Sequence, residues 1–260
     1  MNIFINTDRY SSHANETENR LKNVCSELEI GICSKAEDAD LICSIGGDGT
    51  FLKSSKLDFE KPIVGINTGT VGYLTEISPE NIEESFKDII DGSYHIEERM
   101  MLEGEIIKDD GEIIDIPVSL NEIALSKNTF GVVRFEVLIN DKLINSYTAD
   151  GILVSTPTGS TAYNLSCGGP IAEPNAKIIT LTPIAPHSII NRSIVLSEES
   201  VVKIRITELR NNTASYVLFD GQPIEVETGD VVKVKKSEKT TKIVKLEEKS
   251  FIYMIRENIS

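Results

Sequence analysis

IGGDGTFL, residues 45–52, joins a buried-looking apolar strand to a segment whose pattern is compatible with a helix. Gly46, Gly47 and Gly49 carry no Cβ atom, so their N–H groups can converge on an anion at the start of that helix. Asp48 is the lone carboxylate of this turn, and it would repel a phosphate unless it accepts a proton or helps to hold Mg²⁺. The stretch therefore predicts a phosphate-binding turn. The alternative is an ordinary tight turn in which Asp48 caps the helix.

The turn matches neither common nucleotide-binding pattern. A Walker A loop requires Gly-Lys-Ser/Thr, and the dinucleotide fingerprint requires the spacing G-x-G-x-x-G. The turn must therefore be interpreted from its own residues and from its surroundings in the chain.

The residues around this turn alternate between strand and helix patterns. We expect strands at Ile3–Ile5, Leu41–Ile45 and Pro62–Ile66, and helices at Glu16–Leu28 and from Ser78-Pro79 to a stop at Gly92. The second helix should bury one face that contains Ile82, Phe86, Ile89 and Ile90. Strands separated by helices predict a parallel sheet covered on both faces.

From about Met101 the pattern changes to short strands around polar turns. The expected pairs are 102–108 with 112–118, 132–139 with 143–149, 201–209 with 215–220 around Asn211-Asn212, and 230–235 with 241–247. One helical segment interrupts them at about Ser160 to Cys167, and 249–257 is helix-compatible. We predict an α/β domain over residues 1–99, completed by 248–260, and an all-β, sandwich-like domain over 100–247, so that the fold is α+β overall.

The bulk composition excludes several classes of protein. A formal net charge of −15 argues against nucleic acid as the main partner, because phosphate backbones need clustered Lys and Arg. No apolar run approaches the roughly 20 residues that span a bilayer, and the N-terminus lacks a signal peptide. The four cysteines show no metal-ligand spacing, and the three histidines are scattered. We therefore expect a cytoplasmic protein with reduced thiols, no membrane partner and no zinc site.

Several further motifs follow in order along the chain. They are Asn67–Leu74, a glycine-containing loop after a strand, Asn121-Glu122 at a strand start, Thr148–Gly151, Val154–Ser166 with Gly168-Gly169-Pro170, Pro186–Ser188 and Phe219–Gln222. In the longest of them, Pro157 and Gly159 shape a turn, and Ser160 or Thr161 can cap a following helix. Each motif also has a purely structural interpretation, as a loop, a polar strand end, a capped turn or a β-turn.

These motifs resemble the signatures of a known superfamily. Gly-Gly-Asp-Gly-Thr at 46–50 is similar to the sequence shared by NAD kinases, diacylglycerol and sphingosine kinases, and phosphofructokinases, and by itself it indicates phosphoryl transfer to a hydroxyl. The remaining motifs, in their order and spacing, resemble those of NAD kinases. The resemblance extends from Leu41 to Gln222.

The resemblance implies a role for particular residues. Asp48 would be the general base that accepts the proton of the 2′-hydroxyl of the adenosine ribose. The phosphates of ATP would bind Gly46, Gly47, Gly49 and Thr50. NAD would contact Asp48, Gly49, Phe51, Asn121, Glu122, Asp150, Thr158, Thr161, Ala162, Tyr163, Ser166, Ala185 and Gln222. Mg²⁺ would bridge the phosphate oxygens with no direct protein ligand. Asp150 would reach the dinucleotide across a subunit interface, which implies a homotetramer or homodimer.

Two other functions share part of this pattern. A lipid kinase of the diacylglycerol or sphingosine type would have the same glycine turn, but it should also carry an apolar or basic membrane-facing patch. A non-catalytic dinucleotide sensor would keep the fold without turnover, and the presence of Asp48 argues against it. The sequence leaves open whether ATP or polyphosphate is the donor, and whether NADH is accepted.

Overall fold

The computed structural model describes residues 1–69, 72–128, 131–187, 191–209, 214–246 and 255–256. The chain divides into two compact units, one comprising Met1–Arg99 and Thr240–Ser260 and the other Met100–Lys239. The expected α/β region followed by a β-rich region is confirmed. The divisions between the units fall within two long strands, β5 (His95–Ile107) and β16 (Val231–Lys245).

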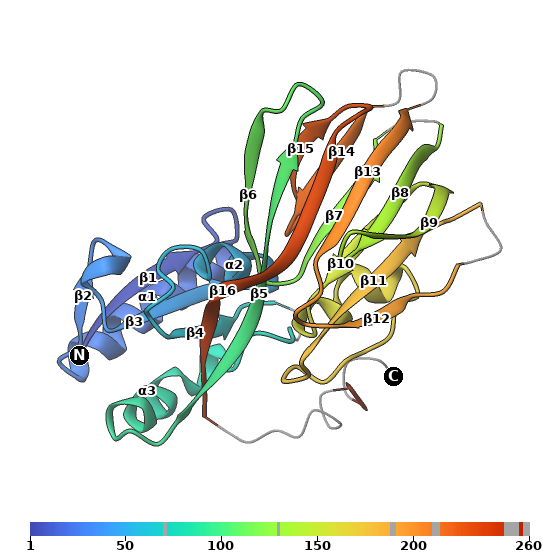
Figure 1. The fold of residues 1–260 in the computed structure, drawn as a ribbon. Helices are drawn as coiled ribbons and strands as arrows, with labels where there is room; N and C mark the ends of the chain where they lie inside the picture. Colours follow the sequence, from blue (N-terminus) through green and yellow to red (C-terminus); the bar gives the residue numbers. More distant parts are fainter. Residues whose placement is uncertain (70–71, 129–130, 188–190, 210–213, 247–254, 257–260) are drawn as a thin grey trace. The chain divides into compact units, whose positions relative to one another are not determined.

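The first unit contains a parallel sheet in the order β2-β1-β3-β4-β16 (Figure 1). Its elements are β1 (Asn2–Thr7), α1 (Ser12–Glu27), β2 (Gly31–Cys33), η1 (Ala36–Asp38), β3 (Leu41–Gly46), α2 (Asp48–Ser54), β4 (Ile63–Asn67), η2 (Pro79–Asn81) and α3 (Ile82–Ile90). All six residues of β3 are buried, as a central parallel strand requires. The three strands and two helices expected for this region are present.

Helix α1 begins earlier than its apolar pattern predicted. Ser11 is the N-cap, and its hydroxyl accepts a hydrogen bond from the Ala14 N–H at 3.3 Å. Leu21 and Cys25, one turn apart, face the sheet and join its apolar core. The capping hydroxyl, rather than the first apolar residue, therefore determines where this helix starts.

Helix α3 departs from the expected pattern at its last residue. Ile82, Phe86 and Ile89 are buried in the core of the first unit, but Ile90 is 47% exposed. Ile90 is turned by about 100° around the helix axis from Ile89, which takes it off the face that packs on the sheet. Gly92 ends the segment with φ +76°, a left-handed conformation that glycine adopts without strain.

The second unit is built from two antiparallel sheets. One sheet has the order β12-β11-β10-β7-β14-β15, and the other places β13 between β16 and β8, with β9 beyond β8 and with β5 pairing β6. The strand bounds are β6 (Ile113–Ser119), β7 (Glu122–Lys127), β8 (Val133–Ile139), β9 (Lys142–Ala149), β10 (Gly151–Ser155), β11 (Ile178–Ile184), β12 (Ile194–Ser197), β13 (Val202–Leu209), β14 (Ser215–Phe219) and β15 (Gln222–Val226). Alternate residues of both sheets form one shared apolar core, which confirms the sandwich-like arrangement.

Two of the four expected strand pairs are wrong. β13 pairs with β8 and β16, whereas β14 pairs with β7 and β15, so the residues around Asn211-Asn212 connect two different sheets. Residues 231–245 form one long strand rather than two, because the polar run in their middle continues the ladder instead of turning. Asn211-Asn212 itself and most of the helix expected at 249–257 lie outside the described residues.

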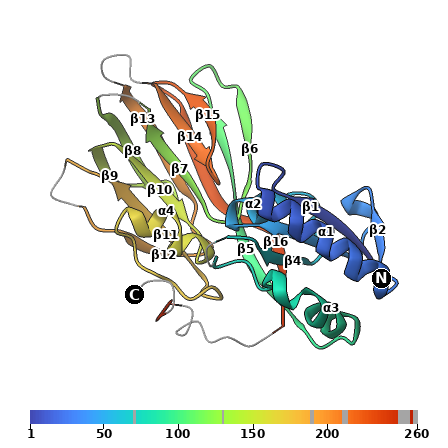
Figure 2. The ribbon, with the colours of Figure 1, turned by 180° about the vertical axis from the view of Figure 1, so that it is seen from behind.

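The helical interruption of the second unit is broken in the middle. It consists of η3 (Thr158–Thr161) and α4 (Tyr163–Ser166), which meet at Ala162 with φ −94° and ψ −130°. Figure 2 shows α4 beside β10 and β11. The expected cap from Ser160 or Thr161 is absent from α4, because the Ser160 hydroxyl bonds to the backbone of Ala172 instead.

Candidate active site

The glycine turn lies where β3 ends and α2 begins. Gly46 has φ +154°, and a Cβ atom there would lie 2.4 Å from Thr50 Oγ1, so only glycine fits. Gly47 and Gly49 are exposed, and a Cβ at either position would meet no atom within 4 Å. Open space therefore lies over the main chain of these two residues, at the start of a helix, where an anion would be favoured.

Asp48 does not cap its own helix through its side chain. Its Oδ2 accepts the Tyr73 N–H and its Oδ1 accepts the Leu74 N–H, both at 3.1 Å. In the register of β3 with β4, Gly46 lies opposite Asn67, so the loops that follow the two strands start side by side. A carboxylate oxygen has two lone-pair sites, so each oxygen of Asp48 retains capacity to accept a further proton or hydrogen bond.

The loop after β4 approaches Asp48 closely. A Cβ on Gly72 would lie 2.4 Å from Asp48 Oδ1, which explains a glycine at this position. Burial, together with the negative charge of Asp48, raises the pKa of the Tyr73 hydroxyl. Thr70 and Val71 of the same motif lie outside the described residues.

Two predicted site residues of this unit are buried. Phe51 has no exposed surface, and its ring packs beside Gly65 in the core. Thr50 is 8% exposed, with its side chain against Gly46. The structure gives the Phe51 side chain a packing role, and its contact with NAD stays a prediction.

In the second unit, Asn121 and Glu122 lie at the start of β7, and their backbone is hydrogen-bonded by Asp220, which is 98 residues from Glu122 in the chain. The Asp220 carboxylate accepts the N–H groups of Leu120 at 3.0 Å, Asn121 at 2.9 Å and Glu122 at 3.4 Å. The Asp220 N–H in turn donates a hydrogen bond to the Glu122 carbonyl at 3.2 Å. The two segments are thereby fixed to each other.

Glu122 is the most perturbed acid of the described site. The residue is 8% exposed, and its Oε2 has no hydrogen-bond partner among the residues that the structure describes. Burial first, and the negative charge of Asp220 second, raise the pKa of the Glu122 carboxyl to about 8. A buried polar atom without a partner indicates a place where a ligand supplies the missing hydrogen bond.

A network of small polar side chains shapes the turn before η3. The Thr156 hydroxyl donates to the Leu120 carbonyl at 2.6 Å and accepts the Gly159 N–H at 2.9 Å. A Cβ on Gly159 would lie 2.1 Å from the Asn121 carbonyl oxygen, so the two segments touch at the backbone. The turn and the Asn121-Glu122 pair therefore form one rigid unit.

Asn164 fixes the broken helix from inside. It is fully buried, its Nδ2 donates to the carbonyls of Ser160 and Pro170, and its Oδ1 accepts the Thr182 hydroxyl at 2.7 Å. Gly169 must lack a Cβ because that atom would lie 2.0 Å from Asn164 Oδ1. This side chain ties residues 160–170 to β11.

The exposed side of the same segment presents the predicted NAD-binding residues. Tyr163 is 36% exposed, and its hydroxyl lies near Cys167. Burial and the nearby Cys167 raise the pKa of Tyr163, while burial and the charge of Glu122 raise the pKa of Cys167. Thr158 is buried, Thr161 and Ala162 are partly buried, and Ser166 is exposed.

The other predicted NAD contacts lie at the ends of strands β10, β11 and β15 of the six-stranded sheet. Asp150 follows β9 and forms an ion pair with Lys127 at 2.6 Å. Ala185 is exposed and has φ +42°, unusual for a residue with a Cβ, and Gln222 is exposed at the start of β15. A groove of about 410 Å³ lies on this sheet and is lined by Ser126, Lys127, Asn128, Tyr216, Leu218 and Pro223.

The structure thus gathers the predicted residues into two groups, one in each unit. The group around Asp48 lies in the first unit, and the group around Glu122 lies in the second. Sequence reasoning missed the positioning roles of Asp220, Thr156 and Asn164. All three stand inside motifs that the sequence singled out, but their partners are backbone groups far away in the chain, which no local pattern reveals.

The positions of the His, Cys, Asp and Glu side chains decide whether the protein by itself could hold a metal ion. Among the described residues, no three His, Cys, Asp or Glu side chains lie close enough together to hold a metal ion. No helix in the described part of the chain has both the length and the apolarity to cross a membrane. The four cysteines are unpaired thiols.

Comparisons with known proteins match both units. The model of the ATP-NAD kinase N-terminal domain matches residues 4–94, and that of the ATP-NAD kinase C-terminal domain matches residues 120–246. A NAD kinase of Caldanaerobacter subterraneus is 38% identical over 226 residues, which are 85% of this chain and 79% of that protein. A NAD kinase of Acetivibrio thermocellus is 37% identical over 249 residues, 91% of this chain and 86% of that protein.

Solved structures share the fold. A NAD kinase from Archaeoglobus fulgidus in complex with ATP superposes with a TM-score of 0.77 at 28% identity, covering 95% of this chain and 94% of that one. Yeast NADH kinase complexed with NADH gives a TM-score of 0.91 at 23% identity, covering 100% of this chain and 87% of that one.

Fold, motifs and relatives together define a phosphotransferase that uses an alcohol group as acceptor. The Asp48 carboxylate beside exposed glycines and the buried acid of the Asn-Glu pair are the features of the site that fit this class. More particularly, the chain belongs to the NAD kinase family.

Proposed function

We propose that this chain transfers the terminal phosphoryl group of ATP, or of another phosphoryl donor, to the 2′-hydroxyl of the adenosine ribose of NAD, and so makes NADP. The observation that carries the proposal is the placement of Asp48. Its carboxylate is held by two backbone N–H groups beside Gly47 and Gly49, whose main chain faces open space. A base is thereby fixed next to a surface suited to phosphate.

Asp48 has one chemical task in this reaction, which is to accept the proton of the ribose hydroxyl. The ribose oxygen forms a bond to the γ-phosphorus, the bond to the bridging oxygen breaks, and ADP leaves. The proton of the hydroxyl passes to the Asp48 carboxylate, a step typically worth about 10²–10⁴-fold. The remaining acceleration comes from alignment and charge neutralisation, because phosphoryl transfer depends mainly on positioning and electrostatics.

The second unit supplies the contacts for NAD. Glu122 offers a buried oxygen that no described residue hydrogen-bonds, and Asn121 precedes it in the chain. Tyr163 exposes a ring that can stack on a planar group of the ligand, and Thr161 and Ser166 offer hydroxyls. The contacts of Thr158, Ala162, Ala185 and Gln222 belong to the same proposal.

The residues present fit a divalent cation carried by the nucleotide. Mg²⁺ keeps several waters and is commonly bound by one or two carboxylates together with substrate phosphates. The described residues offer no larger cluster of acids. When bound, Mg²⁺ would neutralise charge on the phosphate oxygens.

Location and assembly are part of the proposal. Four unpaired thiols suit a reducing cytoplasm. We place Asp150 at a subunit interface of a homotetramer or homodimer, where it would contact dinucleotide bound to a neighbouring copy. Its side chain is 32% exposed beside Lys127, which leaves surface for such a contact. Light scattering of the eluting protein tests the assembly, and a monomeric mass would contradict it.

The activity has a direct test. Purified protein is incubated with ATP, Mg²⁺ and NAD, and NADP is measured with a dehydrogenase that uses only NADP. We expect NADP to accumulate in proportion to protein, and none to form without the donor. If no NADP forms with any of the donors tested, including polyphosphate, the proposal is contradicted. A parallel reaction with NADH in place of NAD tests whether the reduced dinucleotide is accepted.

A further inference from the structure

Asp220 is the charged side chain that joins the start of β7 to the turn between β14 and β15. Its Oδ1 accepts the N–H groups of Asn121 and Glu122, and its Oδ2 accepts that of Leu120. The residue has φ +45°, and Gly221 follows with φ +82°, so the turn itself adopts an unusual backbone that brings the carboxylate to β7. The side chain thus hydrogen-bonds the backbone of the Asn121-Glu122 pair, which is expected to bind NAD.

The backbone of this pair is held from the other side as well. The Asn121 carbonyl accepts the Thr156 N–H at 2.9 Å, and the Leu120 carbonyl accepts the Thr156 hydroxyl. Asp220 satisfies the donors of the segment, while Thr156 satisfies its acceptors. Both sides of this backbone segment are therefore hydrogen-bonded, while the Glu122 Oε2 has no hydrogen-bond partner in the described part of the chain.

Burial and the charge of Asp220 disfavour a negative charge on Glu122. The ionisable groups that interact with it are Asp220 across the strand end and, from the α4 segment, Tyr163 and Cys167. None of the three is cationic. Burial and Asp220 together raise the pKa of Glu122 to about 8, which keeps this carboxyl largely protonated at neutral pH.

We propose that Asp220 is a positioning residue of the NAD site: its carboxylate fixes the backbone of the Asn121-Glu122 pair from the turn between β14 and β15. This inference rests on the proposed function. Asp220 touches neither substrate nor phosphate in this role and acts through the backbone of the Asn121-Glu122 pair. Two consequences differ from those of a purely structural turn, namely a change in NAD affinity and a change in the pH dependence of NAD use.

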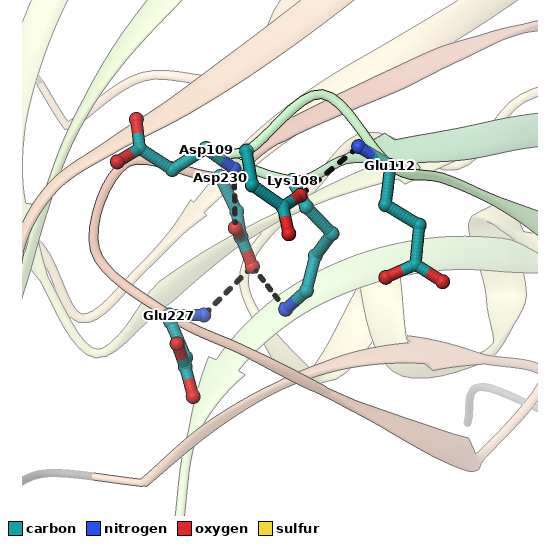
Figure 3. Close-up of polar contacts among 6 residues, drawn as sticks. Lys108, Asp109, Glu112, Glu227 and Asp230 are labelled. Carbon is teal, nitrogen blue, oxygen red and sulfur yellow. Dashed lines mark hydrogen bonds and ion pairs between the residues drawn. The ribbon is translucent and has the colours of Figure 1, made fainter.

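The same unit contains a matched control. Asp230 also accepts backbone N–H groups from two separate turns, those of Glu227 at 2.9 Å and Asp109 at 3.3 Å, and it pairs with Lys108 at 2.8 Å (Figure 3). It is 2% exposed and joins the β5–β6 turn to the connection between β15 and β16. Removing either carboxylate should therefore lower stability, but only one of the two is connected to Glu122.

Two pairs of variants separate the effect of the Asp220 hydrogen bonds from the effect of its charge. Asp220→Asn can keep a carbonyl oxygen at the Oδ1 position, and so the bonds to Asn121 and Glu122, but it removes the charge. Asp220→Ala removes all three bonds. Asp230→Asn and Asp230→Ala are the controls, and the thermal midpoint of each variant reports its stability.

The expected results are specific to each variant. In the unsubstituted protein, kcat/KM for NAD should change across a step near pH 8 that Glu122→Gln lacks, because kcat/KM reports groups of the free enzyme. Asp220→Asn should move this step to lower pH by about one unit, since a neighbouring negative charge raises the pKa of an acid. Asp220→Ala should raise KM for NAD about tenfold and leave kcat within about threefold. The Asp230 variants should lose stability without either effect.

The outcomes that would overturn the inference differ from those that would overturn the function. If the unsubstituted protein makes no NADP, the proposed function fails, and NAD binding by calorimetry still tests Asp220. If the unsubstituted protein makes NADP but the Asp220 variants change KM for NAD and the pH step no more than the Asp230 variants do, the positioning role fails alone. Asp220→Asn keeps this test available should Asp220→Ala not fold.

Discussion

The Oδ1 atom of Asp48 accepts the backbone N–H of Leu74 at 3.1 Å, across a separation of 26 residues. The contact joins the turn after β3 to the loop after β4, and it orients a carboxylate beside open main chain at Gly47 and Gly49. An acid in this position has its direction set by the backbone before any substrate arrives, which is a form of preorganisation.

Asp48→Asn tests the role of this acid. The amide keeps the size of the side chain and one acceptor oxygen, so NAD binding should remain nearly intact. It cannot accept the ribose proton, so kcat should fall by about 10² or more. Steady-state kinetics and NAD titration measure the two effects. Turnover close to the unsubstituted rate would eliminate the general-base role.

The glycines of the turn offer a second test because their constraints differ. Gly47 has φ −95° and ψ −171°, and a Cβ there meets nothing within 4 Å, so Gly47→Ala should change stability by no more than about 0.5 kcal/mol. If phosphate approaches this main chain, the added methyl group should raise KM for ATP about tenfold.

Gly46→Ala is the matched substitution, with the opposite expectation. Its φ of +154° and the nearby Thr50 side chain should make the variant about 2 kcal/mol less stable. Thermal unfolding of both variants, alongside KM for ATP, separates packing from binding. An unchanged KM in Gly47→Ala would remove that residue from the phosphate site.

Glu122 makes a prediction about stability and pH. Its pKa is raised from 4.5 to about 8 in the folded protein, so between these values the folded state holds a proton that the unfolded state has lost. The stability associated with this carboxyl is therefore fully present below about pH 4.5 and is lost as pH rises toward 8. The slope is at most about 1.4 kcal/mol per pH unit.

Glu122→Gln removes this titration. The free energy of unfolding of the variant, relative to the unsubstituted protein, should increase from pH 5 to pH 8. Denaturant unfolding at several pH values measures it, and a constant difference across that range would contradict the buried, protonated state. Glu122→Ala should in addition weaken NAD binding more than ATP binding. Equal losses would move this residue out of the NAD site.

Two lysines on β16 provide a test of buried charge. Lys245 pairs with Glu76 at 2.7 Å with side chains 9% and 6% exposed, whereas Lys242 pairs with Glu60 at 3.1 Å with 28% and 85% exposed. Lys245→Ala removes one partner of a buried ion pair and should cost about 3 kcal/mol. Lys242→Ala should cost less than about 1 kcal/mol. Equal losses in denaturant unfolding would show that burial of the first pair has no energetic weight.

The sequence determined the local elements and the chemical candidates. The buried strand before Gly46, the helix after it and the alternation of strands and helices in the first unit follow from apolar periodicity and glycine placement, which act over a few residues. The same holds for the short strands of the second unit and for the choice of Asp48 and Glu122 as candidate residues.

Only the tertiary structure decided which distant groups meet. It placed β13 and β14 in different sheets, made 231–245 one strand, aimed the N–H groups of Tyr73 and Leu74 at Asp48, and brought Asp220 to the backbone of Glu122. Backbone donors are the same in every residue except proline, so the sequence carries no mark of which carboxylate they will contact. Those contacts follow from strand register and burial, which are properties of the folded chain as a whole.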